Sequence, residues 1–157
     1  MKIQRILIAV DNSKCAEHAA QYGFELAHLY KADVGLANIV EPMISSAQSP
    51  DMISGSIFDP VVASDPELVN IQKEVSENLI ENMIKQFAGD LKVTQFSEFG
   101  NSTDGILDCS AQFNADLIVI GTHARTGLDR LLMGSVAEHV VRHSKVPVLV
   151  IPFKEDN

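Results

Sequence analysis

Apolar residues along the chain form short β-branched runs that alternate with longer segments of helical period. Short apolar runs of this kind are typical of strands that are covered on both faces of a sheet. The run 117–120 is apolar throughout and predicts a central strand, whereas 91–96 is less apolar and predicts a strand nearer an edge. The predicted strands cover 3–10, 34–40, 91–96, 116–120 and 146–151.

Between these runs, apolar and small residues recur at the spacing of one helix face. Turn-forming residues precede the first helix, Asp65 and Pro66 open the second, and Ser102 is expected to cap the third. The predicted helices cover 14–30, 65–89, 102–113 and about 135–143. The polar stretch 42–64 has no clear period and is long for a connection, which predicts a lid, a loop or an interaction segment.

Alternating strands and helices specify a doubly wound, three-layer α/β fold with a mainly parallel, five-stranded, Rossmann-like sheet. The sequence shows no internal repeat and no break in composition. We therefore expect one domain over residues 1–157.

The charge of the chain limits its partners. The 12 Lys and Arg residues against 21 Asp and Glu residues give a net charge of −9, so we expect no nucleic acid and no membrane partner. No apolar run approaches the length of a membrane span or a signal peptide. Cys15 and Cys109 are too few for a disulfide framework and are predicted to be small core residues. These features together predict a cytoplasmic protein.

Two predicted strand ends carry residues that suit a ligand, because ligands of open α/β sheets bind beyond the carboxyl ends of the strands. The first strand ends at Asp11 and the fourth at Gly121. Further on, Gly134 and Ser135 precede the last helix, where free N–H groups and the helix dipole predict an anion site. Ser135 and Glu138 match a capping box, so the alternative is an ordinary helix start without a ligand.

Local positive charge for such a ligand comes from Arg125 and Arg130. His123, in the same segment, has two open interpretations: it hydrogen-bonds a phosphate or only the loop itself. His139 and His143 lie four residues apart, which is metal-ligand spacing, but no third ligand accompanies them and an exposed helix face is favoured. No nucleophile elbow, Walker sequence or paired carboxylate motif is present in the sequence.

The opening ILIAVDNS, the segment GTHARTGLDRLLMGSVAEHVVRHSKVPVLVIP and the chain length resemble the universal stress protein family. ATP-binding members of that family carry G-x2-G-x9-G-[ST] after the fourth strand. Gly121, Gly134 and Ser135 fill three of its positions, and Ala124 replaces the second glycine. An alanine there costs little at negative φ but roughly 1 kcal/mol or more at positive φ. Gly127 is a candidate for restoring flexibility to the loop.

The resemblance implies a role for each matched position. Asp11 would contact the ribose or a phosphate-bound metal such as Mg²⁺, although N-capping of the first helix is the alternative. Ala9 and Val40 would line the adenine pocket, with ordinary strand packing as the alternative for Val40. The amides at 134–136 would hold the distal phosphates. The expected site comprises Ala9, Asp11, Val40, Gly121, His123, Ala124, Arg125, Gly127, Gly134, Ser135 and Val136.

The resemblance further implies an ATP-binding regulatory domain of the stress response that acts on an unidentified signalling partner. The family's usual dimer pairs the last strand, so we expect a homodimer through Val146–Ile151. Hydrolysis is expected to be slow or absent, because no general base for water is visible. Three alternatives stay open: a dimeric module without nucleotide, a hydrolase using Asp11 and a metal, and a phosphoacceptor receiver. The receiver needs an acidic residue at the end of the third strand, and residues 96–98 match it poorly.

Overall fold

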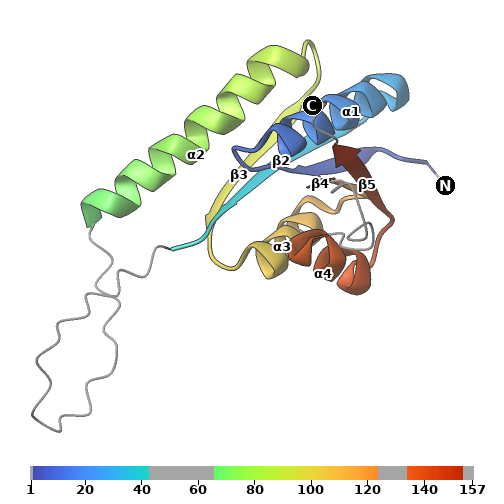
Figure 1. Ribbon diagram of the computed structural model, residues 1–157. Helices are drawn as coiled ribbons and strands as arrows, with labels where there is room; N and C mark the ends of the chain where they lie inside the picture. Colours follow the sequence, from blue (N-terminus) through green and yellow to red (C-terminus); the bar gives the residue numbers. More distant parts are fainter. Residues whose placement is uncertain (1, 43–65, 124–133, 154–157) are drawn as a thin grey trace, which may run out of the picture.

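The computed structural model describes residues 2–42, 66–123 and 134–153, and a parallel sheet runs through them (Figure 1). Within these residues the strand order is β3-β2-β1-β4-β5, and every adjacent pair is parallel. The predicted doubly wound α/β fold is thus confirmed. The strands are β1 (Arg5–Ala9), β2 (Asp33–Val40), β3 (Val93–Phe99), β4 (Leu117–His123) and β5 (Val148–Phe153).

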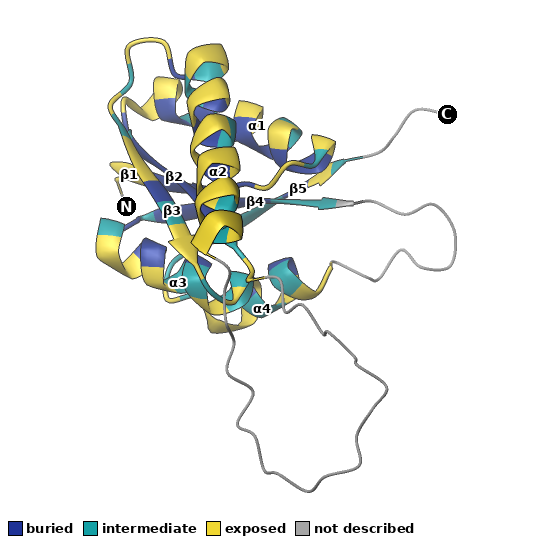
Figure 2. Cartoon of the chain, turned by 90° about the vertical axis from the view of Figure 1, so that its left-hand side faces the viewer, coloured by how far each residue is buried: buried dark blue, intermediate teal, exposed yellow. Residues whose placement is uncertain are grey.

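Two helices cover each face of the sheet. On one face lie α1 (Lys14–Tyr30) and α2 (Pro66–Phe87), and on the other lie α3 (Ser102–Phe113) and α4 (Ser135–His143). Figure 2 shows the buried residues concentrated on the strands and on the inner sides of the helices. No helix in the described part of the chain is both long and apolar enough to cross a membrane.

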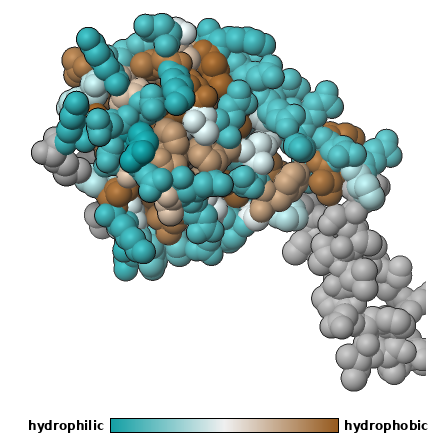
Figure 3. All heavy atoms as spheres, turned by 180° about the vertical axis from the view of Figure 1, so that it is seen from behind, coloured by the Kyte–Doolittle hydropathy of each residue, from teal (hydrophilic) through white to brown (hydrophobic). Residues whose placement is uncertain are grey.

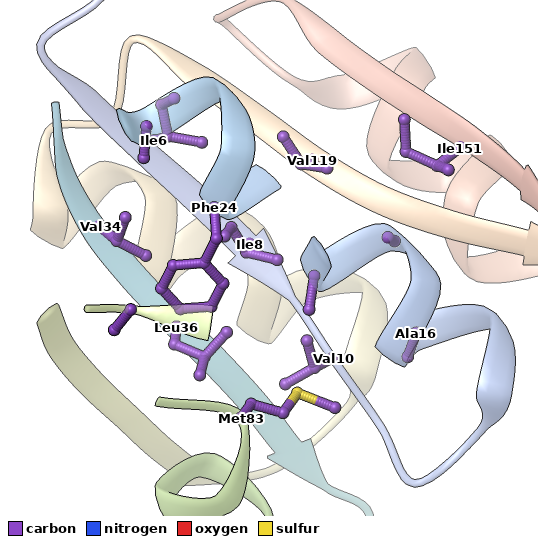
Figure 4. Packing of buried hydrophobic residues seen from close by; sticks show 14 of the residues in the cluster. Ile6, Ile8, Val10, Ala16, Phe24, Val34, Leu36, Met83, Val119 and Ile151 are labelled. Atoms are coloured by element: carbon purple, nitrogen blue, oxygen red, sulfur yellow. The ribbon is translucent and has the colours of Figure 1, made fainter. Parts of the chain in front are cut away.

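The apolar runs fill both faces because successive side chains of a strand point to opposite sides. In and just after β1, Ile6, Ile8 and Val10 pack toward α1 and α2, whereas Leu7 and Ala9 pack toward α3 and α4. Figure 4 shows Phe24 of α1 inserted over Ile8 and the β2 residues Val34 and Leu36. A continuously apolar strand is therefore the sequence signature of this three-layer core.

The strands differ from the sequence prediction mainly at their ends. β3 begins two residues later than expected and continues through Phe99, because its polar residues pair with β2 as far as Val40. β4 likewise continues from Ile120 through Gly121 to His123. Hydrogen bonds of the backbone set these ends, and hydropathy does not report them. The predicted edge position of β3 and inner position of β4 are both confirmed.

The alternative role of Asp11 as the N-cap of α1 does not hold, and the predicted Ser102 cap of α3 is wrong by one residue. Ser13, not Asp11, caps α1, and its Oγ accepts a hydrogen bond from the Ala16 N–H at 3.1 Å. Asn101, not Ser102, caps α3. Side-chain oxygens in neighbouring positions compete for the same N–H groups, so the sequence alone does not separate them. Asp65 and the stretch predicted as a lid or loop lie outside the described residues, apart from Pro42.

Candidate functional site

The strand order reverses between β1 and β4, which is where a ligand of an open α/β sheet is expected. A cavity of about 600 Å³ lies at the carboxyl ends of these two strands. Ala9, Asp11, Gly121 and residues 134–136, all predicted from the sequence, line it. The size falls in the usual range for small-molecule sites, roughly 300–1,000 Å³.

One part of the cavity wall is apolar. It combines the last residues of the inner strands with the inner side of α3. The contributing residues are Ala9, Ala37, Ile39, Ile106 and Ile120. A wall of this composition accepts a flat apolar or aromatic group.

The turn between β1 and α1 is held in place by side chains and by β2. The Val10 N–H donates to the Ala37 carbonyl at 2.8 Å, and the buried Asn38 amide donates to the Val10 carbonyl at 2.8 Å. Asp11 Oδ1 accepts the Ser13 N–H at 2.8 Å. The Asp11 carboxylate is thereby fixed at the edge of the cavity, although it does not cap the helix itself.

At the other end of the cavity, α4 begins without a side-chain cap. Gly134 is its N-cap residue at φ 81°, a left-handed value that favours glycine, and this residue has no side chain that could cap the helix. Ser135 and Val136 line the cavity directly. The N–H groups of a first helical turn have no partner within the helix, so this helix start is suited to bind an anion.

The predicted capping box is therefore wrong. Ser135 is the first residue of α4 and not its N-cap, so its hydroxyl cannot accept from the N–H groups in the geometry of the motif. Glu138 pairs instead with Arg142, one turn on, at 2.8 Å. This arrangement favours a ligand, because neither the Gly134 side of the helix start nor the Ser135–Glu138 pair supplies a side-chain cap within the described residues.

Gly121 is required by the packing of α1 against β4. A Cβ atom at this position would lie 2.6 Å from the carbonyl oxygen of Cys15 and 2.9 Å from its Sγ. Only a residue without a side chain allows the start of α1 to approach β4 so closely. The first glycine of the motif thus brings α1 to the cavity wall.

Charge in the described lining is negative. Asp11 and Glu138 contribute carboxylates, and the described residues contribute no Lys or Arg to the wall. Glu41, nearby, accepts the Ser102 N–H at 3.1 Å, and its hydrogen bonds with the Ser102 hydroxyl and N–H lower its pKa. Burial raises the pKa of the Cys15 thiol, which keeps it neutral and a poor nucleophile. Within the described lining, the positive potential available to an anion comes from backbone amides and the helix dipole.

The remaining predicted residues fall in three places. Val40 does not line the cavity; Ala37 and Ile39 do, because the alternation of β2 turns residue 40 toward the opposite face. His123 is the last residue of β4. Ala124, Arg125 and Gly127, with Arg130, lie outside the described residues.

Several lining residues were missed by the sequence analysis. Ser102 and Ile106 come from the start of α3, and the capping signal there was the available hint that a helix begins beside the site. Cys15 and Ala16 reach the cavity through the close approach of α1, which no local pattern reports. The missed residues are Val10, Cys15, Ala16, Ala37, Ile39, Ser102, Ile106, Ile120, Thr122, Ala137 and Glu138.

The histidine pair of α4 lies outside the cavity lining. His139 and His143 stack with ring centroids 4.1 Å apart, and His139 Nε2 lies 3.4 Å from Asp104 Oδ1 of α3. His143 is exposed, as predicted, and His139 is half-buried. Among the described residues no three His, Cys, Asp or Glu side chains are grouped to hold a metal ion.

The fold and cavity define a Rossmann-like α/β protein with a ligand cavity at its switch point. The profile of the universal stress protein family matches residues 2–152, and the chain belongs to this family. A curated relative, Universal stress protein MJ0531 of Methanocaldococcus jannaschii, is 30% identical over 156 residues, 97% of this chain and 85% of the relative. The solved structure of protein MJ0577 superposes with a TM-score of 0.78 at 27% identity, covering 99% of this chain and 100% of that one.

Two more distant structures share the fold and contain adenine nucleotides. A universal stress protein from Archaeoglobus fulgidus in complex with dAMP has a TM-score of 0.59 at 20% identity, covering 96% of this chain and 99% of that one. A family protein from Arabidopsis thaliana with AMP bound has a TM-score of 0.63 at 16% identity, covering 98% and 94%.

Proposed function

We propose that this universal stress protein binds ATP in the cavity between β1 and β4 and acts as a regulatory domain. The observation that carries the proposal is the uncapped start of α4 at one end of a cavity whose other part is apolar. A nucleotide has this same division, with an apolar base and an anionic tail. The relatives from Archaeoglobus fulgidus and Arabidopsis thaliana, which hold dAMP and AMP, support the choice of adenine.

In this proposal the adenine ring occupies the apolar wall beside Ile39 and Ile120. The ribose and first phosphate lie near Asp11 and Gly121, and the distal phosphates lie at the amides of Ser135 and Val136. Each amide is a fixed donor in the direction of the helix dipole, which stabilises negative charge. Ala124 of the loop then influences the fit of the phosphates.

Asp11 suits a Mg²⁺ ion bound together with the phosphates. Its carboxylate is exposed at the cavity edge, and Mg²⁺ is commonly held by one or two carboxylates and phosphate oxygens. When bound, the ion supplies charge neutralisation between Asp11 and the phosphates. We assign no hydrolytic step to the cavity, since the carboxylate of Glu138 is engaged by Arg142 and Asp11 holds the turn before α1.

Calorimetric titration with ATP, with and without Mg²⁺, tests this assignment on the wild type and Asp11→Asn. Mg²⁺ is expected to tighten ATP binding to the wild type. Asp11→Asn removes a like charge near the phosphates, so metal-free ATP should bind roughly fivefold tighter to the variant and the gain from Mg²⁺ should shrink. Absence of heat in both proteins would favour the dimeric module without nucleotide, in which Ala124 has closed the site.

We further propose a homodimer through the β5 edge of the sheet. β5 pairs only with β4 in the described chain, and Val148, Leu149 and Val150 are half-buried without a covering strand. An apolar edge is a pairing surface. Pro147 precedes the strand and its carbonyl accepts the Ile118 N–H, so its missing N–H costs the edge nothing.

Light scattering at micromolar concentration is expected to give about twice the 17.1 kDa of one chain. Val150→Lys should reduce this to the mass of one chain while the thermal transition is retained, because the pairing strand then carries a charge. A single-chain mass for the wild type would reject the dimer.

A further inference from the structure

The first half of α2 carries an apolar face that the rest of the described chain leaves exposed. Leu68, Ile71 and Val75 are 52%, 51% and 58% exposed, and their spacing of three and four residues places them on one side of the helix. Figure 1 shows this end of α2 extending away from the other helices. We call these three residues the α2 stripe.

The α2 stripe is separate from the side of α2 that packs on the sheet. The buried residues of the helix are Ser76, Ile80 and Met83, all in its second half or middle. Beyond Val75, the stripe direction is continued by Asn78 and Asn82, which are exposed and polar. The apolar face is therefore confined to the first turns, and packing against the protein's own sheet does not explain it.

Charge along one border of the α2 stripe has a regular order. Glu67, Glu74 and Glu81 are exposed and follow one another at intervals of seven residues, and Glu67 and Glu81 also have partners within the chain, Lys85 at 3.4 Å for Glu81. With Leu68, Ile71 and Val75 at the a and d positions of a heptad, all three glutamates occupy the g position, which selects partners in helix pairs. Lys73 lies at position f, away from this border, where it pairs with Glu77 at 3.8 Å.

We propose that the α2 stripe docks an amphipathic helix of a partner protein with Lys or Arg beside its apolar face. The apolar residues supply the contact area, and the glutamates at the g positions choose a basic partner over an acidic one. A second copy of this chain is disfavoured as the occupant. An antiparallel pair of α2 helices would bring the g-position glutamates of the two copies together, and like charges there are destabilising. A parallel pair would place them beside Gln72 and Leu79 at the e positions, which offer no opposite charge.

The probe is a labelled synthetic helix of about three heptads, with Leu at a and d and Lys at e and g, and the matched control peptide carries Glu at e and g. Fluorescence anisotropy with the full-length protein, without nucleotide, should show binding of the Lys peptide only. Ile71→Ser should weaken that binding roughly 10-fold or more, since burial of an isoleucine is lost. Leu29→Ser on α1, where Leu29 is 74% exposed, is the matched control and should have no effect.

Charge reversal tests the role of the glutamates directly. Glu74→Lys/Glu81→Lys should transfer the preference from the Lys peptide to the Glu peptide, with the thermal transition of each variant measured to confirm folding. Equal binding of both peptides by the wild type, or binding that is insensitive to Ile71→Ser, would overturn the proposal.

Two further outcomes would assign the α2 stripe to another occupant and also overturn the proposal. A fall in the light-scattering mass of Ile71→Ser would identify a second copy of the chain. The variant Ile57→Ser/Phe58→Ser changes two apolar residues in the segment that precedes α2. If this variant binds the Lys peptide roughly 10-fold more tightly than the wild type does, the protein's own segment competes with the peptide for the α2 stripe. Neither outcome depends on ATP binding, so the test is independent of the proposed function.

Discussion

Replacing Ser135 with proline is expected to weaken ATP binding about 10- to 100-fold, the loss of one hydrogen bond to a charged group. Proline lacks the N–H group, and the first helical position tolerates it because that N–H has no acceptor within the helix. Gly134 before it has ψ 140°, a value that is compatible with a following proline. The helix should therefore form normally, and calorimetry with ATP would measure the missing donor.

Ser135→Ala separates the backbone donor from the hydroxyl, since it removes only the latter. We expect this variant to bind ATP more tightly than Ser135→Pro, with both close to the wild type in thermal stability. If the two variants lost affinity equally, the hydroxyl would be the group that matters and the helix amide would not be.

Gly121→Ala is expected to destabilise the protein by about 1–3 kcal/mol, the usual cost of overpacking a core. The new Cβ would lie 2.6 Å from the Cys15 carbonyl oxygen, so the start of α1 has to move away from β4. Because that movement also displaces Asp11, ATP binding should fall together with stability. Urea unfolding followed by circular dichroism measures the first effect, and calorimetry measures the second.

Gly105→Ala is the matched control for this substitution. The three atoms nearest to its Cβ would be side-chain atoms of Ile39, at 3.0–3.1 Å, and a side chain can shift where a backbone carbonyl cannot. Alanine also favours the interior of α3 by up to about 1 kcal/mol over glycine. We expect little net change in the free energy of unfolding. A loss as large as that of Gly121→Ala would show that backbone proximity is not the cause.

The sheet could be predicted from the sequence because burial on both faces leaves a direct mark on it. Runs such as Ile6–Ile8 and Ile118–Val119 are apolar at every position, and the order of strands and helices then restricts the topology. The helix α1 was predicted with its observed bounds, Lys14–Tyr30, since its small residues recur along one face. Strands and helices that carry a long hydrophobic pattern could therefore be predicted from the sequence.

Features that depend on a choice between similar polar residues, or on contacts far apart in the chain, were less predictable. Asp11 and Ser13 can each cap a helix, and only the folded turn shows that Asp11 supports Ser13. The placement of Val40 failed for a related reason, since the sequence predicts a strand but not the exact residue at which it meets the cavity. The contact of Gly121 with Cys15 joins residues more than 100 positions apart and has no local signal.

Figure 3 shows a mainly hydrophilic surface on the far side of the molecule, with smaller hydrophobic areas between the polar side chains. The α2 stripe is therefore distinguished by the regular spacing of its apolar residues and the glutamates beside them, and not by its hydrophobicity alone. Salt concentration should change the contribution of its glutamates to partner binding, because salt screens charges at an exposed border more strongly than it affects buried apolar contacts.

The cavity has one further consequence, because its wall includes helices from both sides of the sheet. Cys15 and Ala16 belong to α1 on one side, and Ile106 and Val136 belong to α3 and α4 on the other. A molecule held there contacts two helical layers that the sheet separates in the described part of the chain. Its free energy of binding would then add to the free energy of unfolding of the domain, because the site is complete only when both layers are in place.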